Sequence, residues 1–196
     1  METLRTFIAI ELSGTLKDAL RRIQGELSAE MPARSVRWVQ PDAIHLTLKF
    51  LGDTPVEKVD AVKAALARAA AEVEPFSVTA AGVGCFPNTR QPRVVWVGLQ
   101  EPSGALSRLQ RAVEAQVAPL GFPTERRAFS PHLTLGRVQQ YASRSDVRQI
   151  GEVVATSIVE TLGEMQATAV SYIKSVLQPG GAVYTTLFEA RLGCPP

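Results

Sequence analysis

Apolar residues recur along the chain at two spacings, one typical of strands and the other typical of helices. Residues 3–12 are rich in Phe and Ile, as in a strand, whereas the apolar residues between positions 16 and 27 recur every three to four positions. Ser13 lies between the two segments and carries a side chain suited to cap a helix. This region therefore predicts a strand followed directly by a helix.

Further strands are predicted from short runs of β-branched and aromatic residues bounded by turn-forming residues. These runs cover residues 37–39, 44–51, 76–83, 93–99, 129–137, 169–177 and 183–191. Residues 84–92 are dense in Gly, Pro, Asn and Arg and predict a loop, and residues 178–181 predict a hairpin turn between the last two strands. Residues 138–151 are polar and give no clear assignment.

Two further helices have marked ends. One is predicted to begin with Thr54 as its cap, with Pro55 at the first helical position and Glu57 closing a capping box. The other is predicted over residues 103–120, with Gly121 just beyond its end. Strands with helices between them, in an order repeated about once in each half of the chain, predict an α+β architecture.

Composition limits the number of domains and the class of protein. A chain of 196 residues that is 45% hydrophobic is long enough for one compact unit, so we expect a single domain over residues 1–196. The formal net charge of +2 is too small to indicate a protein that coats nucleic acid. Most of the cations are Arg, which suits either a surface that binds phosphate or simply an Arg-favouring genome.

The cysteines and the apolar segments bear on where the protein works. Cys85 and Cys194 are too few for a disulfide framework or a zinc site built on cysteines. The first residues lack the pattern of an export signal, and Lys63 and Arg68 interrupt the alanine-rich run over residues 61–71. We therefore expect a cytoplasmic protein that does not enter a membrane.

The two histidines of the chain share one sequence context. His45 and His132 are each followed by Leu-Thr-Leu, and the two tetrapeptides, at residues 45–48 and 132–135, lie in different halves of the chain. Chance repetition of this context is rare, so we interpret the pair as an internal duplication. Because side chains alternate along a strand, each motif should present its histidine and its threonine on one face and two leucines to a core.

Two imidazoles and two hydroxyls facing one ligand suit the cleavage of a phosphodiester. A neutral imidazole takes a proton from attacking water while a protonated one supplies a proton to the leaving oxygen, and histidine does both near neutral pH. Thr47 and Thr134 can donate hydrogen bonds to the phosphate oxygens. Only Asp42 or Asp53 could complete a metal site, so we expect neither a metal nor another cofactor.

The paired His-x-Thr-x motifs resemble the 2H phosphoesterase superfamily, and their surroundings are similar to the bacterial and archaeal RNA 2′,3′-cyclic phosphodiesterases, also described as RNA 2′,5′-ligases. The resemblance covers nearly the whole chain. Its clearest segments are residues 5–11, 37–53, 130–137 and 175–184. The resemblance implies two pseudo-symmetric lobes of antiparallel sheet, with helices on the outer faces and a central cleft.

The resemblance also implies a reaction and a set of residues. The reaction is hydrolysis of the 2′,3′-cyclic phosphate on an RNA end or a nucleotide to a 2′-phosphomonoester, with no obligatory protein partner. The implied residues are His45, Thr47, His132 and Thr134, joined by Phe50 and Arg137. Phe50 can stack on a base, whereas Arg137 faces the phosphate only if its strand bulges or ends near Gly136.

Two other functions fit the same residues. The groups that hydrolyse a cyclic phosphate can also join it to a 5′-hydroxyl, which is RNA 2′,5′-ligation. A protein of another class, a non-catalytic module that binds RNA ends or nucleotides, would not need a matched acid and base. The two motifs give no internal reason to assign the acid, and our working assignment makes His45 the acid and His132 the base.

Overall fold

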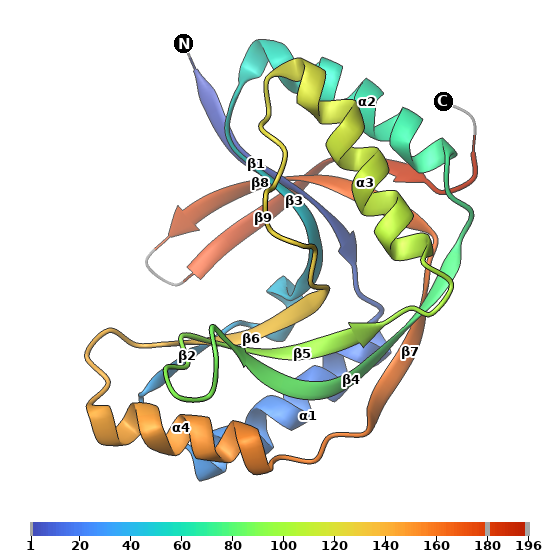
Figure 1. Cartoon of the computed structure of the whole chain (residues 1–196). Helices are drawn as coiled ribbons and strands as arrows, with labels where there is room; N and C mark the ends of the chain where they lie inside the picture. The colour runs from blue at the N-terminus through green and yellow to red at the C-terminus, as the bar shows by residue number, and fades with distance from the viewer. Residues whose placement is uncertain (1, 179–180, 195–196) are drawn as a thin grey trace.

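The computed structural model, which describes residues 2–178 and 181–194, contains two antiparallel sheets in separate lobes (Figure 1). The four-stranded sheet has the order β3 (His45–Pro55), β1 (Thr3–Glu11), β8 (Ala169–Gln178) and β9 (Gly181–Arg191). The five-stranded sheet has the order β2 (Val36–Trp38), β6 (His132–Val138), β5 (Val94–Gln100), β4 (Phe76–Phe86) and β7 (Thr161–Ala167). The α+β architecture expected from the sequence is confirmed.

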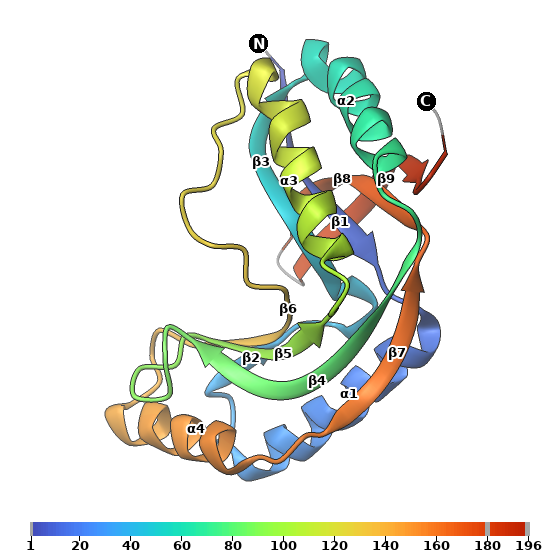
Figure 2. The same cartoon turned by 45° about the vertical axis from the view of Figure 1, so that its right-hand side comes forward.

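Each sheet carries two helices on its outer face, as Figures 1 and 2 show. The pair α2 (Val59–Ala71) and α3 (Ala105–Val117) covers the four-stranded sheet, and the pair α1 (Gly14–Glu30) and α4 (Arg144–Thr156) covers the five-stranded sheet. Short 3₁₀ turns complete the fold: η1 (Pro41–Ala43), η2 (Val56–Lys58) and η3 (Ala118–Leu120). Because β1 and α1 follow each other in sequence but belong to different lobes, the lobes do not coincide with the two halves of the chain.

The first helix forms as its sequence predicts. The side chain of Ser13 accepts a hydrogen bond from the backbone N–H of Leu16 at 3.3 Å, which satisfies one of the free donors at the start of α1. The apolar side chains that recur at helical spacing are all buried, and they are Leu16, Leu20, Ile23 and Leu27. Their burial fixes α1 against the five-stranded sheet.

The predicted start of the second helix is wrong. Thr54 and Pro55 lie at the end of β3, and α2 begins only at Val59, after η2. The side chain of Thr54 is fully buried, and its hydroxyl shares a hydrogen bond of 2.7 Å with the hydroxyl of Thr6. Continued pairing with β1 therefore overrides the local capping signal.

Three elements differ from the sequence prediction: β4 is longer than predicted, and α4 (Arg144–Thr156) and β7 (Thr161–Ala167) were not predicted. Strand β4 continues to Phe86, into the segment predicted as a loop. The unassigned polar segment contains the start of α4, where Ser143 and Asp146 form a capping box, and β7 follows it. The predicted hairpin turn joins β8 and β9, but residues 179–180 at its centre lie outside the described part of the chain.

The buried side chains form one large cluster and one small one. The large cluster lies between the helices and the sheets of both lobes. The small cluster, Phe7, Ala9 and Ile173 with Tyr184 packed against it, lies on the opposite face of the four-stranded sheet, which faces the other lobe. Within the described residues, no helix is both long and apolar enough to cross a membrane.

A buried ion pair links β3, α3 and the segment that follows α3. The Nζ atom of Lys49 lies 2.9 Å from the Oε2 atom of Glu114, and it also donates a hydrogen bond to the carbonyl of Pro123. The carboxylate of Glu114 accepts two further hydrogen bonds, from the side chain of Gln110 at 3.3 Å and from the backbone N–H of Glu125 at 3.4 Å. The pair therefore anchors the long connection from α3 to β6, which runs from one lobe to the other (Figure 2).

Candidate active site

His45 and His132 occupy equivalent positions, each as the first residue of a strand. The Nδ1 atom of His45 lies 3.0 Å from the carbonyl oxygen of Ala43, and the Nδ1 atom of His132 lies 2.8 Å from that of Ser130. A carbonyl oxygen only accepts hydrogen bonds, so Nδ1 carries the proton in both rings. Both Nε2 atoms are therefore left to exchange protons with a ligand.

The residues after each histidine alternate as predicted. Thr47 and Thr134 are partly exposed and face the same side as their histidines. The leucines of both motifs are buried, at 0% and 4% exposure for Leu46 and Leu48 and 0% for the equivalent pair in the second motif. Each lobe thus presents one imidazole and one hydroxyl while the leucines hold the strand to the core.

Both strands bulge at the last residue of the motif. Ala9 pairs with Thr47 and Ile8 with Lys49, so that Leu48 is the extra residue in β3. In β6 the partners of Thr134 and Gly136 are likewise adjacent on β5, so that Leu135 is the extra residue. A bulge of one residue reverses which side chains face the cleft beyond it.

The bulges bring Phe50 and Arg137 to the same face as the histidines. The condition stated from the sequence for Arg137, a bulge near Gly136, is confirmed, and Arg137 is exposed. Phe50 is 67% exposed and is therefore not a core residue. Its ring centroid lies 6.0 Å from that of Phe7, beside the ring of His45.

Aromatic rings surround both histidines, but not in the same way. The ring of His45 stacks on Phe7, with centroids 4.5 Å apart and planes inclined by 24°, and Tyr184 meets it edge-on at 5.2 Å. The ring of His132 meets Phe86 edge-on at 4.9 Å. Sequence analysis did not identify these partners, because they reach the histidines from other strands and share no local motif with them.

Burial lowers the pKa of one of the two histidines. Burial lowers the pKa of His45 to about 4, because the charged form loses solvation, although the hydrogen bond to the carbonyl of Ala43 and the charge of Glu11 oppose the shift. At neutral pH the ring of His45 in this site is uncharged. Burial raises the pKa of the Tyr184 phenol, and the positive charges of Arg137 and Arg5 oppose that shift. Arg137, from the five-stranded sheet, therefore acts electrostatically on a residue beside His45.

A buried glutamine joins β6 to the segment between β2 and β3. The Nε2 atom of Gln24 donates to the carbonyls of Val39, at 2.8 Å, and Leu135, at 2.9 Å. The carbonyl of Leu135 also accepts the backbone N–H of Val39 at 2.8 Å. The bulged residue of β6 is thereby bound to the segment that leads into His45.

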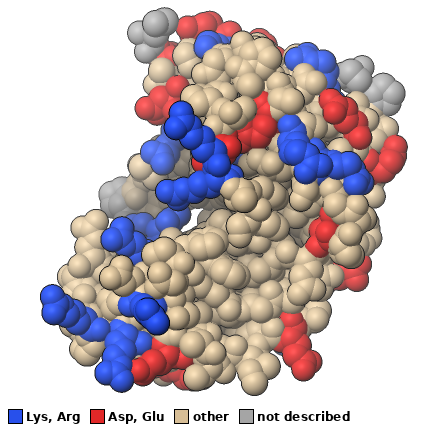
Figure 3. Space-filling view, viewed as in Figure 1, with Lys and Arg blue, Asp and Glu red and all other residues tan. Residues whose placement is uncertain are grey.

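The space between the lobes is hollow and bordered by cations. Figure 3 shows this hollow in the surface, with Lys and Arg side chains gathered along its margin. Within residues 2–178 and 181–194 there is no group of three or more His, Cys, Asp and Glu side chains placed to hold a metal ion. The electrostatic setting is therefore one that attracts a phosphate.

A family model matches both halves of the chain. The model for LigT-like phosphoesterases matches residues 10–96 and again residues 97–184. Each match contains one of the two His-Leu-Thr-Leu motifs.

Curated proteins similar to the chain span nearly its whole length. A protein of Methanothermobacter thermautotrophicus named RNA 2′,3′-cyclic phosphodiesterase is 35% identical over 190 residues, which are 96% of this chain and 99% of the relative. A protein of the same name from Archaeoglobus fulgidus is 33% identical over 184 residues, 94% of this chain and 98% of the relative.

Solved structures show a similar fold. The protein TT0787 of Thermus thermophilus matches with a TM-score of 0.81 and 30% identity over 97% of this chain and 98% of its own. LigT of E. coli, in a structure complexed with 3′-AMP, matches with a TM-score of 0.77 and 26% identity over 97% of this chain and 99% of its own.

Proposed function

The chain belongs to the family of LigT-like phosphoesterases, and on that premise we propose that it is an RNA 2′,3′-cyclic phosphodiesterase. Its substrate is a terminal 2′,3′-cyclic phosphate on an RNA or a nucleotide, and its product is a 2′-phosphomonoester. One observation carries the proposal: two histidines at equivalent positions both bind a carbonyl through Nδ1, and within the described residues neither Nε2 atom has a hydrogen-bond partner. We propose a cytoplasmic setting, in keeping with the two free cysteines.

The reaction needs two proton transfers, which the two rings supply. The base takes a proton from water as its oxygen attacks phosphorus, and the acid gives a proton to the 3′-oxygen as the bond from phosphorus to that oxygen breaks. Thr47 and Thr134 donate hydrogen bonds to the non-bridging oxygens, and Arg137 offsets their negative charge. Phe50 offers an exposed ring on which a base can stack.

The charge state of His45 favours the reverse of our working assignment. A ring with a pKa of about 4 is neutral at the start of the reaction and can accept a proton from water at once. We therefore assign His45 as the base and the more exposed His132 as the acid, which places the departing 3′-oxygen beside His132. The two motifs alone contain no sign of this difference, because it arises from burial of the His45 ring, which packs against Phe7 and Tyr184.

The pH dependence of kcat/KM should be bell-shaped, because the free enzyme needs one neutral and one protonated ring. Protonation of His45 removes the base, so the acidic limb should lie near pH 4 and activity should persist as the pH falls from 7 towards that value. The alkaline limb should vanish in the variant that lacks the acid, which on this assignment is His132→Ala. An alkaline limb that vanishes in His45→Ala instead would restore the working assignment.

Replacement of the 3′-bridging oxygen by sulfur separates the acid from the base. A thiolate leaves without a proton, so this substrate does not need the acid. We expect it to restore most of the activity lost in His132→Ala and none of that lost in His45→Ala. Rescue of His45→Ala alone would assign His45 as the acid.

The activity itself is tested with the full chain and cytidine 2′,3′-cyclic phosphate, followed by phosphorus NMR. We expect a 2′-phosphomonoester to form at the same rate before and after treatment with EDTA, because the proton transfers rest on imidazoles. Formation of a 3′-phosphomonoester would contradict the orientation of the ribose between the two histidines. Activity that is lost with EDTA and restored by zinc or manganese would contradict the metal-independent mechanism.

The same assay addresses the two other functions. With an RNA that carries a 5′-hydroxyl added in excess, a 2′,5′-linked product would demonstrate the reverse reaction, which uses the same groups in opposite protonation states. A non-catalytic module that binds RNA ends would retain nucleotide without turning it over. Both histidines have a free Nε2 atom, which favours turnover.

A further inference from the structure

Two arginines are neighbours on the cleft face of the five-stranded sheet. Arg37 on β2 is paired directly with Arg137 on β6, so the two side chains point to the same face. The bulge at Leu135 turns Arg137 towards the cleft, and Arg37 therefore faces the cleft as well. Both arginines are exposed. Arg37 takes no part in the proton transfers proposed above.

This arginine pair has no counter-charge from the protein. Within the part of the chain that the structure describes, neither guanidinium group forms an ion pair with an acidic side chain. The neighbour of Arg137 on its other side, on β5, is the apolar residue Val94. Like charges directly opposite each other destabilise a sheet. An anion between the two guanidinium groups removes that cost, and a phosphate matches their planar sets of donors.

The arginine pair lies at a suitable distance from the second histidine motif. Thr134 is opposite Trp96 on β5, and Arg137 is opposite Val94, two residues away on the same strand. The rise along a strand is about 3.4 Å per residue, so the two positions are about 7 Å apart along the sheet. Successive phosphates of a nucleic-acid chain are separated by a similar distance. With the cyclic phosphate at Thr134, the next phosphate of the chain can therefore reach the arginines.

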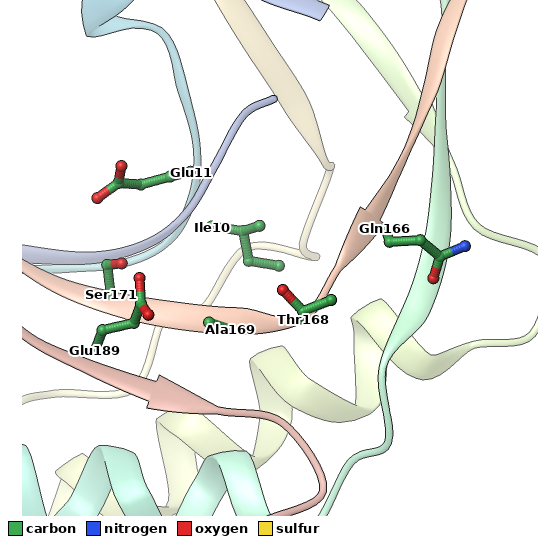
Figure 4. Close-up of a pocket in the computed structure, with 7 residues that line it drawn as sticks. All are labelled: Ile10, Glu11, Gln166, Thr168, Ala169, Ser171 and Glu189. Atoms are coloured by element: carbon green, nitrogen blue, oxygen red, sulfur yellow. The ribbon is translucent and has the colours of Figure 1, made fainter. Parts of the chain in front are cut away.

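The surface on the other side of His45 is acidic. A pocket beside the four-stranded sheet has Glu11 and Glu189 as its charged side chains, and Figure 4 shows both carboxylates on the same side of it. Glu11 is paired with His45 across β1 and β3. Two carboxylates repel a phosphate, so an RNA chain leaves the histidines past the arginine pair and not past this pocket.

We propose that Arg37 and Arg137 bind the phosphate that joins the terminal nucleotide to the nucleotide before it, so that an RNA end is preferred over a mononucleotide. In the proposed reaction the 3′-oxygen departs beside His132, which places the ribose and its 5′-phosphate next to the five-stranded sheet. The terminal base stays at Phe50, because the base and the 5′-phosphate extend from different carbons of the ribose. This preference rests on the proposed function above.

Cytidine 2′,3′-cyclic phosphate with and without a 5′-phosphate tests the arginine pair, because the two substrates differ only in that group. We expect kcat/KM to be about tenfold higher with the 5′-phosphate, the lower end for a hydrogen bond to a charged group, since the arginines are open to water. In Arg37→Gln the ratio should fall to about threefold or less, because one of the two guanidinium groups is lost. Arg22 is exposed on α1, and Arg22→Gln removes the same charge and should keep the ratio.

Calorimetric binding of the two products gives a readout that does not depend on turnover. Cytidine 2′,5′-bisphosphate should bind more tightly than cytidine 2′-monophosphate, and Arg37→Gln should reduce both this difference and its dependence on salt. Equal affinities in the unmodified protein, or a preference that Arg37→Gln leaves intact, would overturn the assignment of the arginine pair. Selective binding of the bisphosphate without turnover of either substrate would support the arginine pair while contradicting the proposed hydrolysis.

Discussion

His45→Ala and His132→Ala should each lower kcat by about a hundredfold or more, which is the usual contribution of a general acid or base. Each substitution removes a ring that carries a free Nε2 atom into the cleft. The measurement is steady-state hydrolysis of cytidine 2′,3′-cyclic phosphate at pH 7. The double variant should lose less than the product of the two single losses, because the two rings act in one reaction step.

Neighbouring substitutions provide the controls for this experiment. Thr47→Val and Thr134→Val should lower kcat less than the histidine variants, since each removes one donor to the phosphate and leaves the proton transfers intact. Thr47→Ser keeps the hydroxyl and should retain most of the activity. Circular dichroism should show that the histidine variants remain folded. Full activity in either histidine variant would refute the assignment of the pair.

Glu114→Leu should lower the free energy of unfolding by about 3 kcal/mol, because it leaves the ammonium of Lys49 buried without its counter-charge. The side chains of this pair are only 7% and 12% exposed. Unfolding in urea, followed by circular dichroism, would measure the change. The exposed pair of Arg148 and Glu152 is the matched control, since its side chains are 82% and 61% exposed. Glu152→Leu should change the stability by about 0.5 kcal/mol or less.

The double variant Lys49→Met, Glu114→Leu separates the loss of the pair from an unpaired charge. Two apolar side chains of similar size should restore most of the stability lost in Glu114→Leu. If the double variant is as unstable as the single one, the loss arises from packing or from the hydrogen bonds to residues 123–125, and not from the buried charge.

The sequence predicts much of the site because each motif contains its own strand alternation. The spacing of His45 and Thr47 places both on one face, and the leucines that alternate with them, Leu46 and Leu48, are buried. The orientation of Arg137 could be stated only as a condition, since a bulge depends on the partner strand. In β6 that partner is β5, where Val95 and Trp96 fix the register.

The remaining features of the site arise from pairing between distant segments. Phe7 and Tyr184 reach His45 from β1 and β9, and no local pattern relates them to the histidine. The false helix start at Thr54 has the same origin, because pairing with β1 extends β3 past a strong capping signal. Helix α4 was not predicted because its first residues are mostly polar. Its capping box can be recognised only once Ser143 is known to end a loop.

The paired bulges divide each motif strand into two stretches of opposite phase. In β3 the odd-numbered residues before Leu48 face the cleft, and beyond it the even-numbered residues do. In β6 the even-numbered residues before Leu135 face the cleft, and beyond it the odd-numbered residues do. If the strand kept that leucine but had no bulge, Phe50 and Arg137 would be in phase with the buried leucines and would face the core. The interval of five residues between the catalytic ring and the side chain of Phe50 or Arg137 therefore depends on the bulge, and a related chain without the bulge should have an interval of four.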